Sequence, residues 1–339
     1  MQTLHDGLPE DAQAKLIPNK KVVDLSTSPD GVTVTCADGT SYSGTVVVGA
    51  DGAHSKVRDL MRTVALETAS TKKPEVNDEK PFLTSYRAMW IRFPTVAPIK
   101  AGDASETHGY DCTLQLFAGE KTSVIGIYER LEKPTRDGVR YNQADEEKFV
   151  ERWGHLPVIA NGPTIKTAYT NRTQAGMVNL EEGVVKHWSS DRIVLAGDAA
   201  HKFTPSTGAG CNNGIVDVVA LSNEMYHAFR AVRATDPEAF PSMEQISAAF
   251  NDYQKGRFDT VKTGQEGASQ ATGAATWSDM THKFVDRHIL SKPSLQKFFS
   301  NRGAAELART PVFEYVEGEE QLVGKFPWAH PIKAAAAAE

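Results

Sequence analysis

Residues 192–214 read RIVLAGDAAHKFTPSTGAGCNNG, and this stretch decides the fold. Residues 193–196 form a continuous apolar run that ends at Gly197 and Asp198, a pattern typical of a strand covered on both faces. The glycine-rich segment that follows leads into residues 213–232, which have helical spacing. A buried strand, a turn that carries a carboxylate, and a helix together indicate an α/β layer, in which ligands bind beyond the carboxyl ends of the strands.

A second stretch has the same form. Residues 45–58 read TVVVGADGAHSKVR, so that another apolar run ends in glycine and a carboxylate, here Asp51. We expect residues 45–48 to be a central strand of the same layer and residues 55–61 to form a short helix. Two Asp-Gly pairs upstream supply the positive φ of tight turns, and predict a small antiparallel meander with strands at 21–25, 32–36 and 42–48.

The segments between and after these stretches have other patterns. Candidate strands at 84–93, 113–117 and 122–128 predict a second, mainly antiparallel sheet, followed by a helix at 144–153. Residues 68–80 are polar and read as a surface loop, and residues 242–288 and 293–309 read as mostly helical. The domains expected are an α/β layer split over 1–80 and 180–240, a substrate-binding sheet at 81–179, a helical region at 241–331 and a tail at 332–339.

Composition narrows the function classes. The 339 residues are 40% hydrophobic with a net charge of −6, which excludes a disordered chain and disfavours nucleic acid or anionic lipid as partners. No apolar run approaches the ~20 residues of a transmembrane helix, and the three cysteines form neither a disulfide framework nor a metal pair. We therefore expect a cytoplasmic protein with a small-molecule partner and no metal. The sequence leaves open whether it is a homodimer.

The two strand-end turns carry residues suited to binding a cofactor. Asp198 can accept hydrogen bonds from a ribose or polyol, and the glycine-rich loop can bring backbone amides to an electronegative group. For a single loop of this kind, a tight turn with a helix cap is the simpler interpretation, and Asp51 has the same alternative as a cap of the following helix. His54 and His201 are more often structural hydrogen-bonding residues than catalytic bases. The spacing identifies no catalytic residue, although Tyr86, Arg87, His108, Asp198 and His201 are available for acid–base chemistry.

In combination, the two motifs resemble those of FAD-dependent monooxygenases of the aromatic-hydroxylase type (group A), including fungal enzymes that hydroxylate or epoxidise natural products. The similarity covers residues 20–331, and includes Ser55, Val57 and Arg58 in the first motif and Gly208 to Gly214 in the second. It implies an FAD/NAD(P)-binding Rossmann-like layer with an inserted antiparallel substrate sheet and a helical C-terminal region. It also implies NADPH and O2 as co-substrates and a small apolar aromatic or prenylated natural product as substrate.

The resemblance also implies roles for individual residues. Asp198 would bind the flavin ribityl chain, Pro205 would lie beside the isoalloxazine ring, and Asp51 would support FAD and NADPH handling. The full set of expected cofactor-binding residues is Asp51, Gly52, Asp198, Pro205, Gly208, Ala209, Gly210 and Asn213. In the inserted sheet, Tyr86, Met89, Trp90 and Phe117 are candidate walls of the substrate pocket.

One part of the family pattern is not found in this sequence. The family opens with a G-x-G-x-x-G turn inside a βαβ unit of roughly 30 residues, which binds the FAD pyrophosphate. We therefore expect an FAD-binding layer that is incomplete at its N-terminus, and weak or absent FAD binding by this chain alone. The strands at 46–48 and 193–195 should then be covered by residues 1–18 or by dimerisation, or leave the chain poorly soluble. A cofactor-free isomerase or cyclase that evolved from a flavin monooxygenase, and a non-catalytic binding protein, are the alternative functions.

Overall fold

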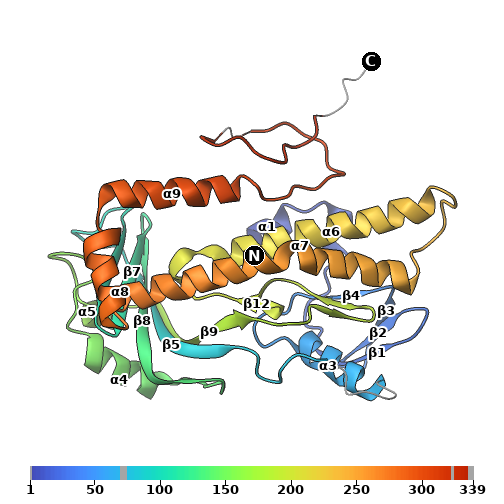
Figure 1. Ribbon diagram of the computed structural model, residues 1–339. Coiled ribbons are helices and arrows are strands. Elements are labelled where there is room, and N and C mark those ends of the chain that lie inside the picture. The colour runs from blue at the N-terminus through green and yellow to red at the C-terminus, as the bar shows by residue number, and fades with distance from the viewer. Residues whose placement is uncertain (1, 69–74, 322–323, 335–339) are drawn as a thin grey trace.

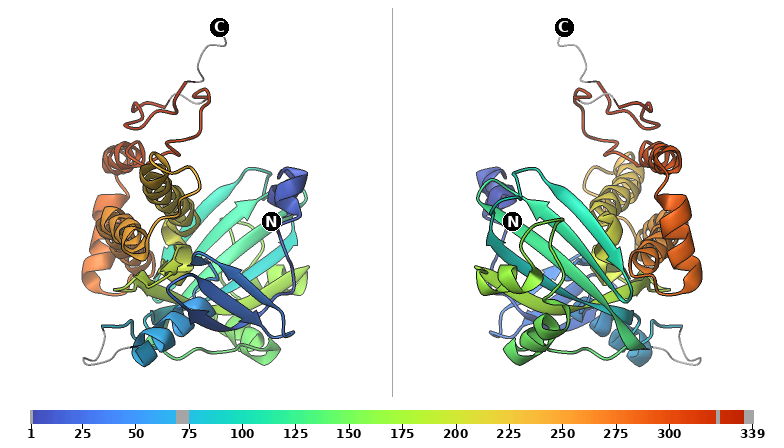
Figure 2. Two further views of the ribbon diagram at one scale, coloured as in Figure 1. Left: turned by 90° about the vertical axis from the view of Figure 1, so that its right-hand side faces the viewer. Right: turned by 90° about the vertical axis from the view of Figure 1, so that its left-hand side faces the viewer.

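The structure is a computed structural model that describes residues 2–68, 75–321 and 324–334. It is a mixed α/β fold with an inserted antiparallel sheet and a helical C-terminal region, as predicted. The strands β1 to β4 lie at one end of the molecule and the longer strands at the other (Figure 1). Two long helices, α6 (Ala209–Arg233) and α7 (Met243–Ala275), pack against each other and run along the length of the molecule (Figures 1 and 2).

The N-terminal part is a small antiparallel sheet. Two short helices precede it, and the elements are α1 (Gln2–Asp6), α2 (Glu10–Gln13), β1 (Val22–Thr27), β2 (Val32–Cys36) and β3 (Ser41–Gly44). Gly39 has a φ of +82° in the turn between β2 and β3, which is the left-handed conformation expected of an Asp-Gly turn. The predicted meander is thus confirmed for its first two strands.

A second sheet joins the two motifs that are distant in sequence. Its strands, in spatial order, are β10 (Ser189–Ser190), β11 (Ile193–Leu195) and β4 (Val47–Gly49). β4 and β11 pair in parallel, so the two apolar runs share one layer, as the sequence predicted.

The boundaries and burial of the first run were predicted wrongly. The strand expected at 42–48 is divided, because β3 ends at Gly44 and β4 begins in a different sheet at Val47. In this sheet β4 is an outer strand of the described residues and not a central one. Val48 is therefore 48% exposed, whereas Ile193 to Leu195 are fully buried.

The third sheet has six strands and is antiparallel throughout. In spatial order the strands are β12 (His201–Lys202), β9 (Gln174–Val184), β5 (Leu83–Pro94), β8 (Thr122–Thr135), β7 (Cys112–Ala118) and β6 (Ala104–Gly109). The strands predicted at 84–93, 113–117 and 122–128 are confirmed as β5, β7 and β8. The sequence analysis missed β6 and β9. β9 also extends past residue 179, the expected end of the substrate-binding sheet.

The two faces of this sheet carry different side chains because successive residues of a strand alternate. One face packs on α4 (Gln143–Trp153) and α5 (Ile165–Thr170) through a core that includes Met89, Ile91 and Phe149. The residues that alternate with these form a smaller cluster of Tyr86, Ala88, Tyr128 and Leu180. The sheet therefore keeps its larger apolar core away from the two motif turns.

The remaining helices complete the fold. They are α3 (Lys56–Thr68), the short 3-10 turns η1 (Gly197–Ala199) and η2 (Pro205–Thr207), α8 (Met280–Val285), the π-helical turn η3 (Asp286–Leu290) and α9 (Pro293–Leu307). The core beside β11 includes Trp188, Phe250 and Tyr253, and the Tyr253 hydroxyl donates to the Leu195 carbonyl at 3.2 Å. This contact fixes α7 to the strand that leads into the second motif.

Several predicted segments differ from the structure or lie outside it. The helix expected at 55–61 continues to Thr68. Part of the predicted loop at 68–80, residues 69–74, lies outside the described residues, as do residues 335–339 of the tail. Within residues 2–68, 75–321 and 324–334, no helix combines the length and the apolar character needed to span a bilayer.

Candidate functional site

The Asp-Gly and Gly-Asp turns lie at one edge of the three-stranded sheet. β4 ends at Gly49 and β11 ends at Leu195, and these two residues are register partners. Each chain then enters its turn, with Asp51 in the first and Asp198 in the second. The parallel pairing thus brings the two carboxylate-bearing turns together.

Asp51 uses both carboxylate oxygens within its own turn. Oδ1 accepts from the Ser55 hydroxyl at 2.5 Å, and Oδ2 accepts from the Val57 amide at 3.0 Å. The neighbouring Gly52 has a φ of +85°, which favours glycine. Asp51 therefore caps the start of α3, which agrees with the simpler of the two interpretations left open for it.

Arg58 connects the first turn to the second. It is buried, and its guanidinium donates to the Ala199 carbonyl at 3.0 Å and to the Ala53 carbonyl at 2.8 Å. The guanidinium also lies over the Phe82 ring, with 5.0 Å between Cζ and the ring centroid. A single side chain thus holds the two motif loops in a fixed relation.

The Gly-Asp turn packs closely on α6 and leaves the Asp198 carboxylate partly exposed. Gly197 has a φ of +58° and lies against Gly214, because a Cβ on Gly197 would be 3.6 Å from the Gly214 Cα. The Asp198 carboxylate is partly exposed and pairs with Lys202. A Cβ on Gly210 would lie 4.0 Å from Asp198 Oδ1, so this carboxylate faces the first turn of α6.

The N-terminus of α6 has no side-chain cap. Gly208 is the N-cap residue with a φ of +65°, and a Cβ there would have no atom within 4 Å. Ala209 and Gly210 begin the 25-residue helix, whose first turn contains no acidic residue. The first amides of a helix lack intrahelical partners and carry a partial positive charge, so this end suits an electronegative group.

A buried polar network under α6 was not predicted from the sequence. The Asp217 carboxylate, fully buried, accepts from the Gly197 amide at 2.9 Å, from His201 Nε2 at 2.5 Å and from Arg257 Nε at 2.9 Å. Burial raises the pKa of Asp217, but the His201 and Arg257 contacts outweigh this effect and lower the pKa below its ordinary value. Arg257 also donates to the side-chain oxygen of Asn213 at 2.9 Å.

The same network engages the side chains of Asn213 and His201. The Asn213 amide nitrogen donates to the Ala209 carbonyl at 3.0 Å, so both ends of its side chain are engaged within the protein. His201 is fully buried and holds the turn through Asp217, as expected for a structural histidine.

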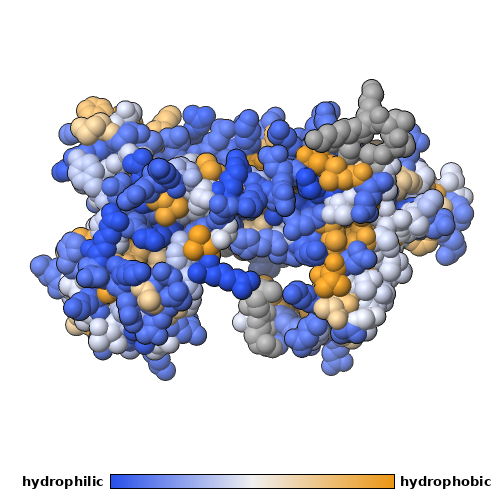
Figure 3. All heavy atoms as spheres, turned by 90° about the horizontal axis from the view of Figure 1, so that it is seen from below, coloured by the Kyte–Doolittle hydropathy of each residue, from blue (hydrophilic) through white to orange (hydrophobic). Residues whose placement is uncertain are grey.

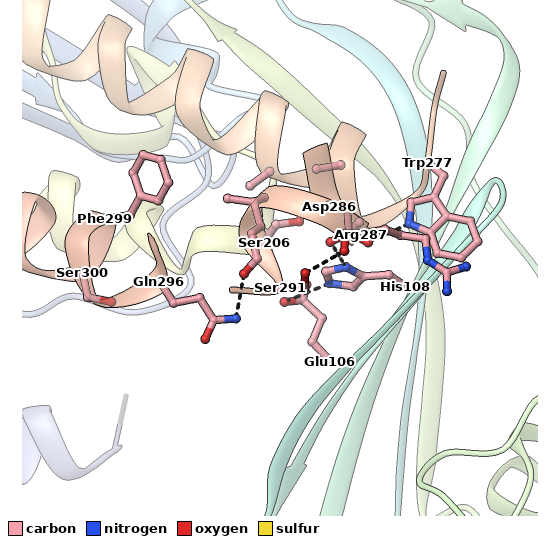
Figure 4. Close-up of a pocket in the computed structure, with 14 residues that line it drawn as sticks. Glu106, His108, Ser206, Trp277, Asp286, Arg287, Ser291, Gln296, Phe299 and Ser300 are labelled. Carbon is pink, nitrogen blue, oxygen red and sulfur yellow. Dashed lines mark hydrogen bonds and ion pairs between the residues drawn. The ribbon is translucent and has the colours of Figure 1, made fainter. Parts of the chain in front are cut away.

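A cavity of about 1090 Å³ borders the second motif. Ser206, within η2 and next to Pro205, lines it, and so do residues of β6, α7, η3 and α9 (Figure 4). The Ser206 hydroxyl bonds to the Thr272 hydroxyl at 2.7 Å. Gln115 Nε2 approaches the Ser206 carbonyl at 3.4 Å and the Glu106 carboxylate at 3.1 Å. The loop that carries Pro205 is thereby tied to the cavity wall.

The four predicted pocket residues do not line this cavity. Met89 is fully buried in the core against α4 and α5, on the opposite face of β5 from Tyr86. Trp90 and Phe117 are exposed. The strand register puts Tyr86, Trp90 and Phe117 on one face of the sheet and Met89 on the other, so the four residues do not line one pocket together.

A second groove follows β4. It has a volume of about 1070 Å³, and Val46, Val47 and Val48 line it together with side chains of β1 and α3. Seen from below, apolar side chains gather in the right-hand part of the molecule, where β1 to β4 lie (Figure 3). Among the described residues, none of 2–18 lines the groove. The expectation that residues 1–18 cover these strands is therefore wrong for the described residues.

Comparison with known proteins identifies the family. Residues 4–235 match the family described as the FAD binding domain, and both motif turns lie inside this match. The chain belongs to the FAD binding domain family. This membership confirms the family that the two motifs indicated, and Asp198, Gly208 and Gly210 are candidate positions for its cofactor.

Relatives in this family are named FAD-dependent monooxygenases. The chain is 32% identical over 266 residues to the FAD-dependent monooxygenase verC1 of Penicillium polonicum, which covers 76% of this chain and 31% of that protein. It is 28% identical over 344 residues to the FAD-dependent monooxygenase DEP2 of Alternaria brassicicola, which covers 98% of this chain and 62% of that protein. The chain thus spans less than two thirds of the length of these relatives.

Solved structures have a similar fold. Klebsiella pneumoniae HpxO complexed with FAD and uric acid aligns with a TM-score of 0.60 at 18% identity, over 85% of this chain and 66% of that one. A salicylate hydroxylase substrate complex aligns with a TM-score of 0.58 at 20% identity, over 87% of this chain and 70% of that one. Both similarities concern the arrangement of strands and helices.

Proposed function

We propose that this chain forms part of an FAD-dependent monooxygenase that hydroxylates or epoxidises a small, mainly apolar natural product, with NADPH and O2 as co-substrates. The observation that carries the proposal is the Gly-Asp turn, where Asp198 faces the uncapped N-terminus of α6 beside a large cavity. The names of the relatives support the same activity.

The residues of this turn fit a flavin. Asp198 offers a partly exposed carboxylate to the hydroxyls of a ribityl chain. These hydroxyls would compete with Lys202, the ion-pair partner of Asp198, for the carboxylate oxygens. The amides of Ala209 and Gly210 would face the electronegative edge of the ring, because they lie in the uncapped first turn of α6. The lack of a side chain at Gly208 and Gly210 leaves room for the ring to approach. Pro205 would lie beside the ring system.

Two of the expected cofactor residues act indirectly in this proposal. Asp51 and Asn213 have their side chains engaged with protein groups, so we assign them to holding the loops. Gly52 permits the turn that places Asp51.

The flavin would supply the reduction of O2 and the transfer of one oxygen atom. This chain's own residues would bind and orient the substrate and exclude water from the cavity next to Ser206. The apolar part of that cavity consists of alanines on α7 with Trp277, Leu290 and Phe299, which suits a substrate with a fused-ring or prenyl body.

The proposal is tested by titrating the purified chain with FAD at equilibrium, because we expect weak binding by this chain alone, and then adding NADPH. Quenching of flavin fluorescence that saturates with added FAD, followed by bleaching of the bound flavin by NADPH, is the expected result. No saturable change at any FAD concentration would contradict the proposal and favour a cofactor-free isomerase or cyclase.

A further inference from the structure

His108 lies between two carboxylates at the wall of the cavity that Ser206 borders. It comes from the edge strand β6, and its Nδ1 is 2.8 Å from Asp286 Oδ1 on the π-helical turn η3. Its Nε2 is 3.4 Å from Glu106 Oε2 on the same strand. Figure 4 shows these three side chains together at one end of the cavity.

Other contacts fix the Nδ1 side of the imidazole. Asp286 Oδ2 accepts from Trp277 Nε1 at 2.7 Å, so both oxygens of this carboxylate have partners. Asp286 is 13% exposed in its side chain, and Trp277 also lies beneath the Arg287 guanidinium at 5.6 Å. The orientation of the His108 ring is therefore set by two elements outside its own strand.

The Nε2 side is held much less firmly. A separation of 3.4 Å is beyond the usual range of an N–H···O hydrogen bond. Glu106 also has another partner, because its Oε1 accepts from Gln115 at 3.1 Å. His108 is 28% exposed and lines the cavity, so its Nε2 is open to a hydrogen bond with a ligand.

The rest of the wall defines the ligand class. Ala271, Ala274, Ala275, Leu290 and Phe299 form an apolar surface, and Glu106, His108, Asp286 and Arg287 gather at one end. The uncharged polar residues Ser206, Ser291, Gln296 and Ser300 also line the cavity (Figure 4). The charged groups at one end of a partly apolar wall suit a ligand with a mainly apolar body and a polar group at that end. Irregular π-helical turns such as η3 are frequent at functional sites.

We propose that His108 Nε2 hydrogen-bonds a hydroxyl or carbonyl oxygen at one end of an otherwise apolar ligand in this cavity, and that Asp286 and Trp277 position the imidazole. The inference rests on the proposed function in taking this cavity as the substrate site. It adds the residue that orients the substrate and the chemical group that the residue recognises.

The test compares 2-naphthol with naphthalene as probes, by equilibrium dialysis against the flavin-free chain. Only 2-naphthol has a hydroxyl that can hydrogen-bond His108 Nε2. We therefore expect wild type to bind 2-naphthol about tenfold more tightly than naphthalene. His108→Asn retains only a group in the place of Nδ1 and should abolish this preference. His108→Gln places an amide near Nε2 and should retain most of it.

Control variants separate ligand recognition from folding. Leu290→Ala, on the apolar wall, should weaken both probes equally and leave the preference unchanged. If His108→Asn unfolds, Asp286→Asn provides a second route, since it should reduce the preference by disordering the imidazole. In NMR spectra, the Nε2 resonance of His108 is identified by its loss in His108→Gln. Its chemical shift should change when 2-naphthol is added and stay the same when naphthalene is added.

An equal preference in wild type and His108→Asn, or no binding of 2-naphthol to wild type, would overturn the proposal. These measurements contain no flavin, so their failure concerns His108 alone. A failure of flavin binding would appear in the FAD experiment instead.

Discussion

The guanidinium of Arg58 donates to the Ala199 carbonyl at 3.0 Å, across 141 positions of the sequence. Through this bond the helix after the first motif holds the turn of the second, and the Ala53 carbonyl accepts from the same side chain. This buried cation therefore links the two motif loops in addition to the pairing of β4 with β11.

Replacing Arg58 with methionine should lower the free energy of unfolding by about 2–4 kcal/mol, because a buried carbonyl and a partly buried one lose a charged donor. Urea unfolding measures the change. Arg140→Met, at an exposed position, is the matched control and should alter stability by less than about 0.5 kcal/mol. Equal effects of the two substitutions would show that Arg58 does not hold the loops.

Gly49 is needed where β4 passes beneath α3. A Cβ at this position would lie 2.8 Å from Val57 Cγ1 and 2.9 Å from Leu195 Cδ2. Gly49→Ala should therefore destabilise the chain by about 1–3 kcal/mol, the range for overpacking a core. Gly267→Ala, within α7 and with no atom within 4 Å of its Cβ, should be neutral or stabilising by up to about 1 kcal/mol.

Shortening Val57 should relieve this clash only in part. Val57→Ala removes Cγ1, but a Cβ at Gly49 would still lie 2.9 Å from Val57 Cβ and 2.9 Å from Leu195 Cδ2. The double variant Gly49→Ala/Val57→Ala should therefore lose only slightly less stability in urea unfolding than the two single variants together. A double variant as stable as Val57→Ala alone would mean that Cγ1 accounts for the whole clash.

His108 predicts a pH dependence of stability. Burial lowers the pKa of His108, but its contacts with the Glu106 and Asp286 carboxylates outweigh burial and raise the pKa above its ordinary value of 6.5. Because the folded state favours the protonated form, the contribution of His108 is complete below pH 6.5 and is lost as the pH rises through the raised pKa.

The measurement is the free energy of unfolding of wild type and His108→Gln at several pH values from below pH 6.5 upward. The variant keeps Glu106, Asp286 and Arg287 in place, so the difference between the two proteins isolates the imidazole. We expect this difference to shrink as the pH rises. A difference that stays constant or grows would contradict the assigned direction of the pKa shift.

The parts of the fold that sequence reasoning predicted well have strong local patterns. The apolar runs before Gly49 and Gly197 predicted two strands of one layer, and the strand alternation of 84–93 predicted β5. β6, with the sequence ASETHG, was missed because a polar edge strand has no apolar alternation. Its strand conformation comes from pairing with β7, which a local pattern does not contain.

The site shows the same division. Asp198 and Gly208 are recognisable from their turn, whereas the His108–Asp286 contact joins residues 178 positions apart and depends on how η3 packs on β6. Asp217 and Arg257 lie within long helical patterns, where a charged residue usually indicates a solvated face. Only the packing of α6 on α7 places them in the buried network.

The most direct test of the flavin site is a fluorescence titration of FMN and lumiflavin with wild type and Asp198→Ala. FMN carries the ribityl chain, which lumiflavin lacks, so loss of Asp198 should weaken FMN binding about 10- to 100-fold and leave lumiflavin binding unchanged. Asp24→Ala, which removes an exposed carboxylate on β1, should change neither. Equal FMN binding by wild type and Asp198→Ala, or no saturable binding of FMN by wild type, would contradict the account.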